Sequence, residues 1–411
     1  MESKLIIILI VVIGAIAISQ LVRVYELTAK LRKHGEHEIP MRDNYLNAKL
    51  MLAFMVLQFG GFIYLMLKYG WTGRGPAASV QGESTDWLLN LNLVLVSAIF
   101  FFTNFLLFYF SYKYVKRLGV KAYYYPHNNK LEMLWTVVPA AVLAVIIILG
   151  LQTWNDVTGA SPKDAISLEL YSKQFDWTAR YSGGDNTLGR TDYKLITGTN
   201  ELGLMTAATI DSSIQAMRHG AGGILEIQKI LNNRDTVLTD SLVNVLRKDL
   251  GTKERLLRLL NQMKATHNLA LDKHVYDDII QRDTLYLCVN KPYEISFRSK
   301  DVIHSAYFPH FRTQMNTVPG YGTRMKFTPN KTTAEMRTIK NLPTFHYVLM
   351  CNKICGGAHY KMKMMVVVLE EAEYNAWMKS KGNKTFKDTY FPAPAAPATT
   401  PAADTVKTAM N

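Results

Sequence analysis

The sequence is poor in cysteine and has no motif for covalent haem attachment. Its 411 residues include three cysteines, Cys288, Cys351 and Cys355. None of them lies in a C-x-x-C-H sequence, so no covalently attached c-type haem is encoded. All three follow the last long apolar stretch. If that part of the chain is exported, its compartment permits a Cys351–Cys355 disulfide.

Long apolar stretches are abundant. Hydrophobic residues make up 48% of the chain. Four stretches approach the ~20 residues that a bilayer-spanning helix requires. They run over residues 5–22, 50–67, 88–110 and 134–151. We therefore predict four transmembrane helices in a lipid bilayer.

The basic residues predict the orientation of these helices. The formal net charge of +14 would suit nucleic acid, but many cations lie in two short loops beside apolar stretches. The first loop contains Arg23, Lys30, Arg32, Lys33, Arg42 and Lys49, and the third contains Lys113, Lys116, Arg117, Lys121 and Lys130. The second loop, 72–86, contains only Arg74. The positive-inside rule therefore places the N-terminus and everything after residue 151 outside, and no nucleic-acid partner is predicted.

The first apolar stretch has a second interpretation, a cleaved signal peptide. It contains the small-x-small triplet Ala15-Ile16-Ala17. Removing one span while the N-terminus stays outside would put both basic loops outside and the C-terminal region inside. Because that reverses the charge rule, we expect the stretch to be retained.

Beyond the last apolar stretch, strand-like and helical patterns alternate. Strand candidates lie in 166–180 and at 285–289, 293–298, 324–327, 345–350 and 364–369. Several short strands in an exported region predict a small sandwich or Greek-key barrel. Between them, 222–271 has helical spacing, and Gly251-Thr252 as stop and N-cap predicts a helical hairpin. The Pro- and Ala-rich composition after Phe391 predicts a disordered tail.

One short segment contains the most informative side chains. Residues 351–362 read C-N-K-I-C-G-G-A-H-Y-K-M, with two thiols, an imidazole and a thioether. Such soft ligands favour copper, and His304, at the end of a strand candidate, offers a second imidazole. Zinc remains an alternative because Cys and His also suit tetrahedral zinc, although Met362 argues against it.

These motifs resemble, in order, the copper-binding domain of cytochrome c oxidase subunit II. The matching segments are D-V-I-H at 301–304, V-P-G at 318–320, F-T-P at 327–329 and the run 351–362. Upstream, L-E-M-L-W-T-V-V-P at 131–139 looks like the start of that family's second transmembrane helix. Q-F-D-W at 174–177 resembles its aromatic electron-input strand, and G-R-T-D at 189–192 resembles a bacterial version of the following loop.

The resemblance implies a membrane-anchored α plus all-β protein, with four transmembrane helices followed by a cupredoxin-like Greek-key β-barrel or sandwich with a helical insertion. The implied domains are two extra N-terminal helices at 1–83, a subunit II helical hairpin at 84–153, an exported copper domain at 154–381 with an insertion at about 205–275, and a disordered tail at 382–411. The expected location is the bacterial inner membrane, with the N-terminus and C-terminal domain on the periplasmic side.

The same resemblance implies the electron-input subunit of a respiratory terminal oxidase, an oxidoreductase and proton translocase. A binuclear CuA centre of two coppers would take single electrons from a c-type cytochrome and pass them to haem in catalytic subunit I. The implied ligands are His304, Cys351, Cys355, His359, Met362 and the backbone carbonyl of Lys353. Oxygen reduction belongs to the separate subunit, because this chain lacks transmembrane helices with several histidines.

The resemblance assigns roles to three further residues. Phe175 and Trp177 would serve electron input, and Glu132 would serve proton uptake at the cytoplasmic end of the fourth helix. Phe175 stands where the family usually has Trp, and Asp176 where it usually has another aromatic residue. A membrane-attached cytochrome or a supercomplex partner is therefore a candidate donor beside soluble cytochrome c.

The sequence departs from the family at a magnesium site. The family usually has Glu at the position of Lys353 and often Asp at the position of Asn316, near the contact with subunit I. An ammonium group cannot ligate a cation. We expect this magnesium site to be lost or rebuilt.

Three other classes of protein fit the residues less well. A copper-free structural or docking subunit of a quinol-oxidase-like complex would be expected to lack the thiolates. A copper-delivery or metal-sensing membrane protein would not require the segment 131–139. A disulfide-stabilised binding module would leave His304, His359 and Met362 unexplained.

Overall fold

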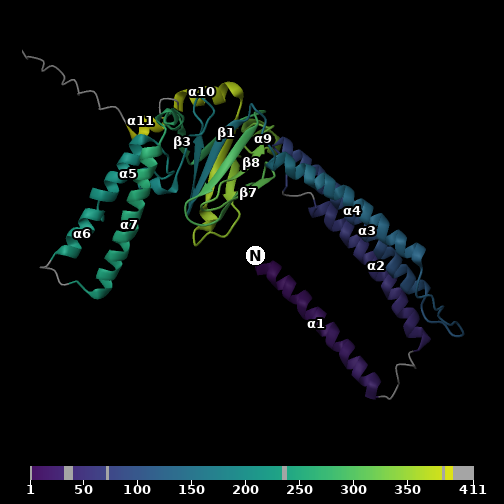
Figure 1. The fold of residues 1–411 in the computed structure, drawn as a ribbon. Coiled ribbons are helices and arrows are strands. Elements are labelled where there is room, and N and C mark those ends of the chain that lie inside the picture. Colours follow the sequence, from purple (N-terminus) through teal and green to yellow (C-terminus); the bar gives the residue numbers. More distant parts are fainter. Residues whose placement is uncertain (1, 32–39, 71–73, 234–237, 382–384, 392–411) are drawn as a thin grey trace, which may run out of the picture. The chain divides into compact units, whose positions relative to one another are not determined.

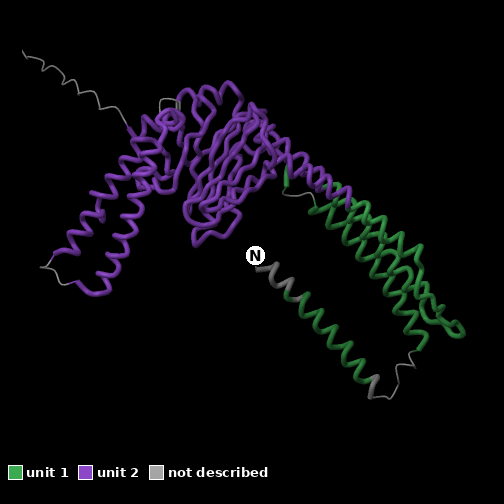
Figure 2. Tube along the Cα trace, in the orientation of Figure 1, with its two compact units in different colours: residues 1–75, 90–143 green, residues 76–89, 144–411 purple. Residues whose placement is uncertain are grey.

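The computed structural model describes residues 2–31, 40–70, 74–233, 238–381 and 385–391 (Figure 1). The chain divides into two compact units (Figure 2). One comprises residues 1–75 and 90–143, and the other comprises 76–89 and 144–411. The third and fourth helices each contribute to both units.

The first unit is built from long apolar helices. They are α1 (Glu2–Leu31), α2 (Met41–Tyr69), α3 (Val80–Lys113) and α4 (Asn129–Thr158). All four are long and apolar enough to cross a membrane, which agrees with the predicted spans. Their described apolar side chains are largely exposed to the surroundings, as expected for lipid-facing helices. The chain is a multi-pass membrane protein.

The second unit contains a sandwich of two five-stranded sheets. The first sheet has the order β3 (Ile279–Arg282), β2 (Asp176–Tyr181), β1 (Ile166–Lys173), β5 (Tyr293–Ser299) and β8 (Thr323–Phe327). The second has the order β4 (Thr284–Cys288), β10 (Lys363–Leu369), β9 (Tyr347–Cys351), β6 (His304–Phe308) and β7 (Thr313–Thr317). Buried side chains from both sheets form one core. The predicted fold class, membrane helices followed by a cupredoxin-like β-sandwich with a helical insertion, is confirmed.

Strand patterning accounts for most of the sheets. In β5, buried and partly buried residues alternate, as the period of two requires for a strand with one face in the core. Strands β3, β6 and β7 lie outside the strand candidates of the sequence, and they have only four or five residues each. His304 was predicted at the end of a strand, but it is the first residue of β6.

The helical insertion consists of α5 (Ala207–His219), α6 (Ile224–Asn232) and α7 (Asp240–Thr266), with α5 and α6 packed on α7 (Figure 1). The predicted helix break at Gly251-Thr252 is wrong, because α7 runs through both residues. A single glycine lowers helix stability by only about 1 kcal/mol, and buried Leu260 helps to hold α7 against its neighbours. Shorter helices are α8 (Lys273–Tyr276), α9 (Thr333–Lys340), α10 (Glu371–Lys381) and α11 (Phe386–Tyr390).

Replacing Gly251 by alanine is expected to stabilise α7 by up to about 1 kcal/mol, because Gly251 is helical and a Cβ there meets nothing within 4 Å. Slower amide exchange along α7 is the measurement. Gly203→Ala is the matched control and should destabilise, since Gly203 has φ +65° and its Cβ would lie 2.4 Å from the Asp192 carbonyl oxygen. Unchanged exchange in Gly251→Ala would contradict the prediction.

The segment predicted as a disordered tail contains a helix. Helix α11 lies inside the range 382–411, and the buried Phe386 packs in a small cluster with Tyr171, Leu204 and Val275. Thr385 caps this helix through Asp388. The structure differs here because one aromatic side chain finds a buried site that composition does not reveal. Residues 392–411 lie outside the described residues.

The first residue of α3 and the two residues before it are joined to the sandwich. Ala78 donates its N–H to the His310 carbonyl at 2.8 Å, and Ser79 Oγ donates to the Phe311 carbonyl at 2.7 Å. Val80 donates its N–H to the Thr328 carbonyl at 3.0 Å. The start of the third membrane helix therefore shares hydrogen bonds with the β-domain.

A buried ionic network lies in the first sheet. Arg180, on β2, bonds Glu169 of β1 at 2.5 Å and Asp278, just before β3, at 2.7 Å. Glu169 also bonds Arg298 of β5. Burial acts to raise the pKa of Glu169, but Arg180 and Arg298 outweigh it and lower the pKa to about 2. Burial raises the pKa of Asp278 to about 7 in spite of Arg180.

Candidate metal centre

The sulfur-containing segment is held at one end of the second sheet. Strand β9 ends at Cys351, which pairs with Ala306 of β6. Cys351 donates its N–H to the Met362 carbonyl at 3.0 Å, which closes the loop 351–362. Asn352 donates its N–H to the Ser305 carbonyl at 3.1 Å. These bonds bring the loop next to His304 at the start of β6.

Cys355 lies at the centre of the cluster. Its Sγ is 3.9 Å from Cys351 Sγ, 3.5 Å from His359 Nδ1 and 3.8 Å from Met362 Sδ. Burial and the neighbouring Cys351 raise the pKa of the Cys355 thiol to about 11. Without a metal this thiol is protonated at neutral pH, so metal binding would release its proton.

Cys351 joins the remaining two groups. Its Sγ lies 3.9 Å from His304 Nδ1 and 3.2 Å from the Lys353 carbonyl oxygen. The ligand atoms of His304, Cys351 and Cys355 all lie within 4.8 Å of one another. Both thiols are free, and their separation is far beyond the ~2.05 Å of a disulfide bond. The structure thus brings together all six predicted metal-binding groups.

The six donor groups suit copper. Two thiols, two imidazoles, one thioether and one carbonyl converge, and His304, Cys351, Cys355 and Met362 are buried. Soft sulfur donors with imidazole suit copper far better than magnesium or calcium. Backbone hydrogen bonds of Cys351 and Asn352 hold these groups together.

Two residues without a predicted role orient the site. Asp301 Oδ1 lies 2.9 Å from His304 Nε2, and Asp301 Oδ2 accepts the Gln174 N–H at 2.7 Å. Gln174 Nε2 donates to the Cys355 carbonyl at 2.5 Å. Burial acts to raise the pKa of Asp301, but the hydrogen bonds from Gln174, His304 and Val302 outweigh it and lower the pKa.

The ionised Asp301 therefore fixes the tautomer of His304. A carboxylate on Nε2 holds the proton there and leaves Nδ1 free to face the thiols, the usual arrangement for a metal-bound histidine. Sequence reasoning missed this role, although the spacing of an acid three residues before a candidate histidine was visible. Gln174 had no sequence signal, because its bonds to Asp301 and Cys355 join segments far apart in the chain.

The predicted aromatic residues Phe175 and Trp177 flank the cluster. The rings of Trp177 and His304 are edge to face with centroids 6.2 Å apart. A Cβ on Gly356 would lie 2.9 Å from Phe175 Cζ, so the Phe175 ring covers the loop at Gly356. Glu132 lies in the first turn of α4, in the other unit, where its carboxylate accepts the Asn128 N–H at 3.3 Å.

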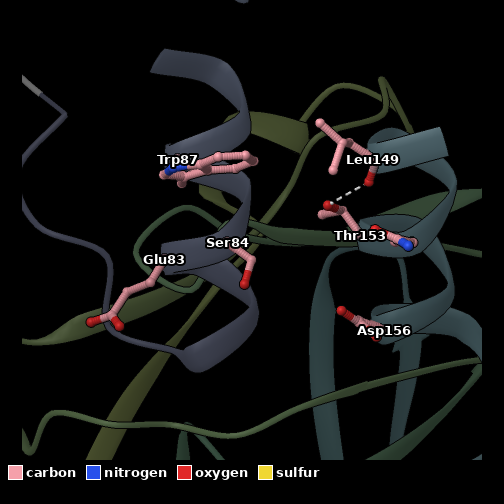
Figure 3. A pocket seen from close by; sticks show the side chains of 7 residues that line it. Glu83, Ser84, Trp87, Leu149, Thr153 and Asp156 are labelled. Atoms are coloured by element: carbon pink, nitrogen blue, oxygen red, sulfur yellow. Dashed lines mark hydrogen bonds between the residues drawn. The ribbon is translucent and has the colours of Figure 1, made fainter. Parts of the chain in front are cut away.

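A pocket of about 470 Å³ lies between α3 and α4, away from this cluster (Figure 3). Its lining residues are Glu83, Ser84, Trp87, Leu149, Gln152, Thr153 and Asp156. Thr153 Oγ1 donates to the Leu149 carbonyl at 3.0 Å, and Glu83 points away from Asp156 and bonds Lys331 at 2.7 Å. The pocket contains none of the predicted metal-binding groups.

Comparisons with known proteins find similarity to subunit II of cytochrome c oxidase. The family described as "Cytochrome C oxidase subunit II, transmembrane domain" matches residues 71–153. The alternative cytochrome c oxidase subunit 2 of Bradyrhizobium diazoefficiens is 27% identical over 339 residues, which are 82% of this chain and 92% of the relative. Cytochrome c oxidase subunit 2 of Cereibacter sphaeroides is 23% identical over 318 residues, which are 77% of this chain and 82% of the relative.

Among solved structures, the periplasmic domain of subunit II of cytochrome oxidase (CoxB) of Bradyrhizobium japonicum is similar to this chain. The alignment covers 55% of this chain and 99% of the solved chain. The sequence identity is 15% and the TM-score is 0.27.

Proposed function

As this chain is a homologue of cytochrome c oxidase subunit II, we propose that it is the electron-input subunit of a respiratory terminal oxidase. Its relatives are subunits of an oxidoreductase, and the chain acts as a subunit of such an enzyme. Its partner is catalytic subunit I, in which haem takes the electrons and oxygen is reduced. The donor is a c-type cytochrome.

The convergence of six groups around two buried thiols is the observation that supports this proposal. His304, Cys351, Cys355, His359, Met362 and the Lys353 carbonyl would hold the metal. A binuclear copper centre at this position would supply one-electron redox chemistry. The loop excludes water from the sulfur atoms, since Cys351, Cys355 and Met362 belong to the hydrophobic core.

The surrounding residues position the ligands and connect the site to the surface. Asp301 holds the His304 ring, and Gln174 holds both Asp301 and the Cys355 carbonyl. The partly buried Phe175 ring contacts the exposed Gly356 segment, where an electron from a docked donor would arrive. Buried Trp177 fixes the other side of His304. In this proposal Glu132 admits protons from the cytoplasmic side.

The proposed location is the inner membrane of a bacterium. Most of the loop cations lie in two loops, one between α1 and α2 and the other between α3 and α4. The positive-inside rule would place these two loops in the cytoplasm. The β-domain would then face the periplasm together with the N-terminus. A donor on that side, soluble or membrane-attached, would reach the Phe175 surface.

The magnesium ion of related oxidases does not fit the residues of this chain. Lys353 and Asn316 are both exposed and offer an ammonium group and an amide where carboxylates would be needed. Asn352 Nδ2 donates to Gln314 Oε1 at 3.1 Å in the same region. We expect no magnesium bound by this chain at the contact with subunit I.

The direct test is metal analysis of the purified oxidase complex. We expect two coppers in this chain sharing one unpaired electron, seen in the electron paramagnetic resonance spectrum. A chain with no copper in an active quinol-oxidising complex would favour a structural or docking role. One zinc per chain, or a Cys351–Cys355 disulfide that persists after reconstitution, would also refute electron input.

Replacing Gly356 by alanine is expected to slow electron input about tenfold while copper content stays the same. The new Cβ would lie 2.8 Å from Gln174 Nε2 and 2.9 Å from Phe175 Cζ, at φ +137°, so both side chains must move. Stopped-flow reduction by a cytochrome c measures the rate. Gly357→Ala is the matched control, because its Cβ meets nothing within 4 Å. Equal rates in the two variants would contradict the prediction.

A further inference from the structure

The loop joining α3 and α4 lies at a membrane surface, because both helices are long and apolar enough to span the bilayer. Helix α3 ends at Lys113 and α4 begins at Asn129, and both are long and apolar enough to span a bilayer. A connection of this length between two spanning helices must lie in the headgroup region or just beyond it. This segment, 113–130, is here called the α3–α4 loop.

The α3–α4 loop combines an unbalanced positive charge with a hollow. A cavity of about 980 Å³ is lined by Lys113, Tyr114, Val115, Lys116, Arg117, Val120, Lys121, Ala122 and Tyr123. Four of these residues are cationic, and the sequence contains no Asp or Glu between Lys113 and Leu131. Four cationic side chains therefore line one cavity, and no acidic residue of the same loop is present to neutralise their charge.

Exposed apolar and aromatic side chains surround these cations. Tyr123 and Tyr124 are 87% and 86% exposed, and Leu118 and Val120 are 86% and 67% exposed. Tyrosine is favoured at the membrane interface, where one end of its side chain is apolar and the other is hydrated. A free phosphate ion would leave these apolar groups in water, whereas a phospholipid would cover them with its glycerol and acyl groups.

We propose that the α3–α4 loop binds the headgroup phosphate of an anionic phospholipid. Lys116, Arg117 and Lys121 contact the phosphate oxygens, with the arginine able to donate two hydrogen bonds at once. Leu118, Val120 and the tyrosines rest in the interface beside the lipid backbone. Each basic residue near an anionic surface strengthens such binding, so the three cations add to one another. This site is separate from the metal centre and does not depend on its function.

The test uses the complete oxidase complex in detergent micelles, loaded with phosphatidylglycerol. Native mass spectrometry counts lipids retained on this chain. The triple variant Lys116→Gln/Arg117→Gln/Lys121→Gln is expected to lower retention at least tenfold. The charge-conserving variant Lys116→Arg/Arg117→Lys/Lys121→Arg is expected to retain the lipid, and an unchanged elution volume of the complex in gel filtration shows that each variant is folded and assembled.

The matched control removes three cations from around the other basic loop, Arg23→Gln/Arg42→Gln/Lys49→Gln, and should change retention less than twofold. Equal loss in this control, or full retention in the Lys116 triple variant, would overturn the proposal. Phosphatidylcholine should be retained poorly by the unaltered chain. Displacement of the anionic lipid by millimolar inorganic phosphate would show a free-phosphate site and overturn the lipid assignment.

Discussion

Replacing Cys355 by serine is expected to abolish the binuclear copper signal and to lower electron input by more than about 100-fold. Cys355 Sγ is the central atom of the cluster, within 3.9 Å of Cys351 Sγ, His359 Nδ1 and Met362 Sδ. Loss of an outer partner of a ligand already costs about 10- to 100-fold in metal affinity, and loss of a thiol that would itself hold the metal should cost more. Copper analysis, electron paramagnetic resonance and reduction by cytochrome c are the three measurements.

The matched control is Cys288→Ala. Cys288 is a free, buried cysteine at the end of β4, and its nearest hydrogen-bond acceptor is the neighbouring Val289 carbonyl. This variant removes one thiol without touching the cluster and should keep both copper and turnover. If Cys355→Ser retained two coppers and the unaltered spectrum, the assignment of the loop 351–362 as the metal centre would fail.

Replacing Arg180 by methionine is expected to destabilise the β-domain by about 3–5 kcal/mol, the usual cost of removing one partner of a buried ionic group. Arg180 is buried and bonds two carboxylates, Glu169 and Asp278, as well as the Gly189 carbonyl at 2.9 Å. Its removal leaves Asp278 with no cationic partner in the network. Thermal unfolding of the full chain in detergent, followed by the change in tryptophan fluorescence, measures the effect.

Arg324→Met on β8 is the control for this variant. Arg324 pairs with Glu294 at 3.6 Å, and its side chain is 62% exposed. An exposed pair of this kind contributes only about 0–1 kcal/mol, so the unfolding temperature should change little. A similar drop in unfolding temperature in both variants would show that the buried network stabilises the domain no more than an exposed ion pair does.

The defect of Arg180→Met should also depend on pH. Burial raises the pKa of Asp278 to about 7 from an ordinary value of 3.8, so the folded state binds a proton that the unfolded state has released. This contribution is fully present below the unfolded pKa of 3.8 and is lost as pH rises through about 7. Without Arg180, the ionised form of the buried Asp278 carboxylate is less favourable than it is in the unaltered protein. We therefore expect the variant to be closer to the unaltered protein at pH 5.5 than at pH 8.

The sequence predicts the parts of this molecule that depend on local composition. The four membrane helices follow from apolar length alone, and α2 to α4 each contain the predicted span. The soft donors of 351–362 also lie close together in the chain, so their convergence needs only one loop. These features require no knowledge of long-range packing.

The features that the sequence did not predict depend on distant contacts. Gly251 resembles a helix end in isolation, but packing of α7 against α5 and α6 carries the helix through it. Gln174 is an ordinary polar residue until β1 and β2 bring it between Asp301 and Cys355. His304 begins a strand because β6 pairs with β7 and β9, which lie later in the chain.

The hydrogen bonds at the start of α3 set an order for the biogenesis of this protein. Ser79 bonds the carbonyl of Phe311, which is 232 residues further along the chain. At ordinary rates of protein synthesis, on the order of 10 to 50 s separate the appearance of the two residues at the ribosome. The third membrane helix is therefore synthesised well before its N-terminal end acquires its partners. Only synthesis and folding of the β-domain as far as Thr328 complete these bonds, so the insertion machinery handles a helix whose N-terminal end has not yet met them.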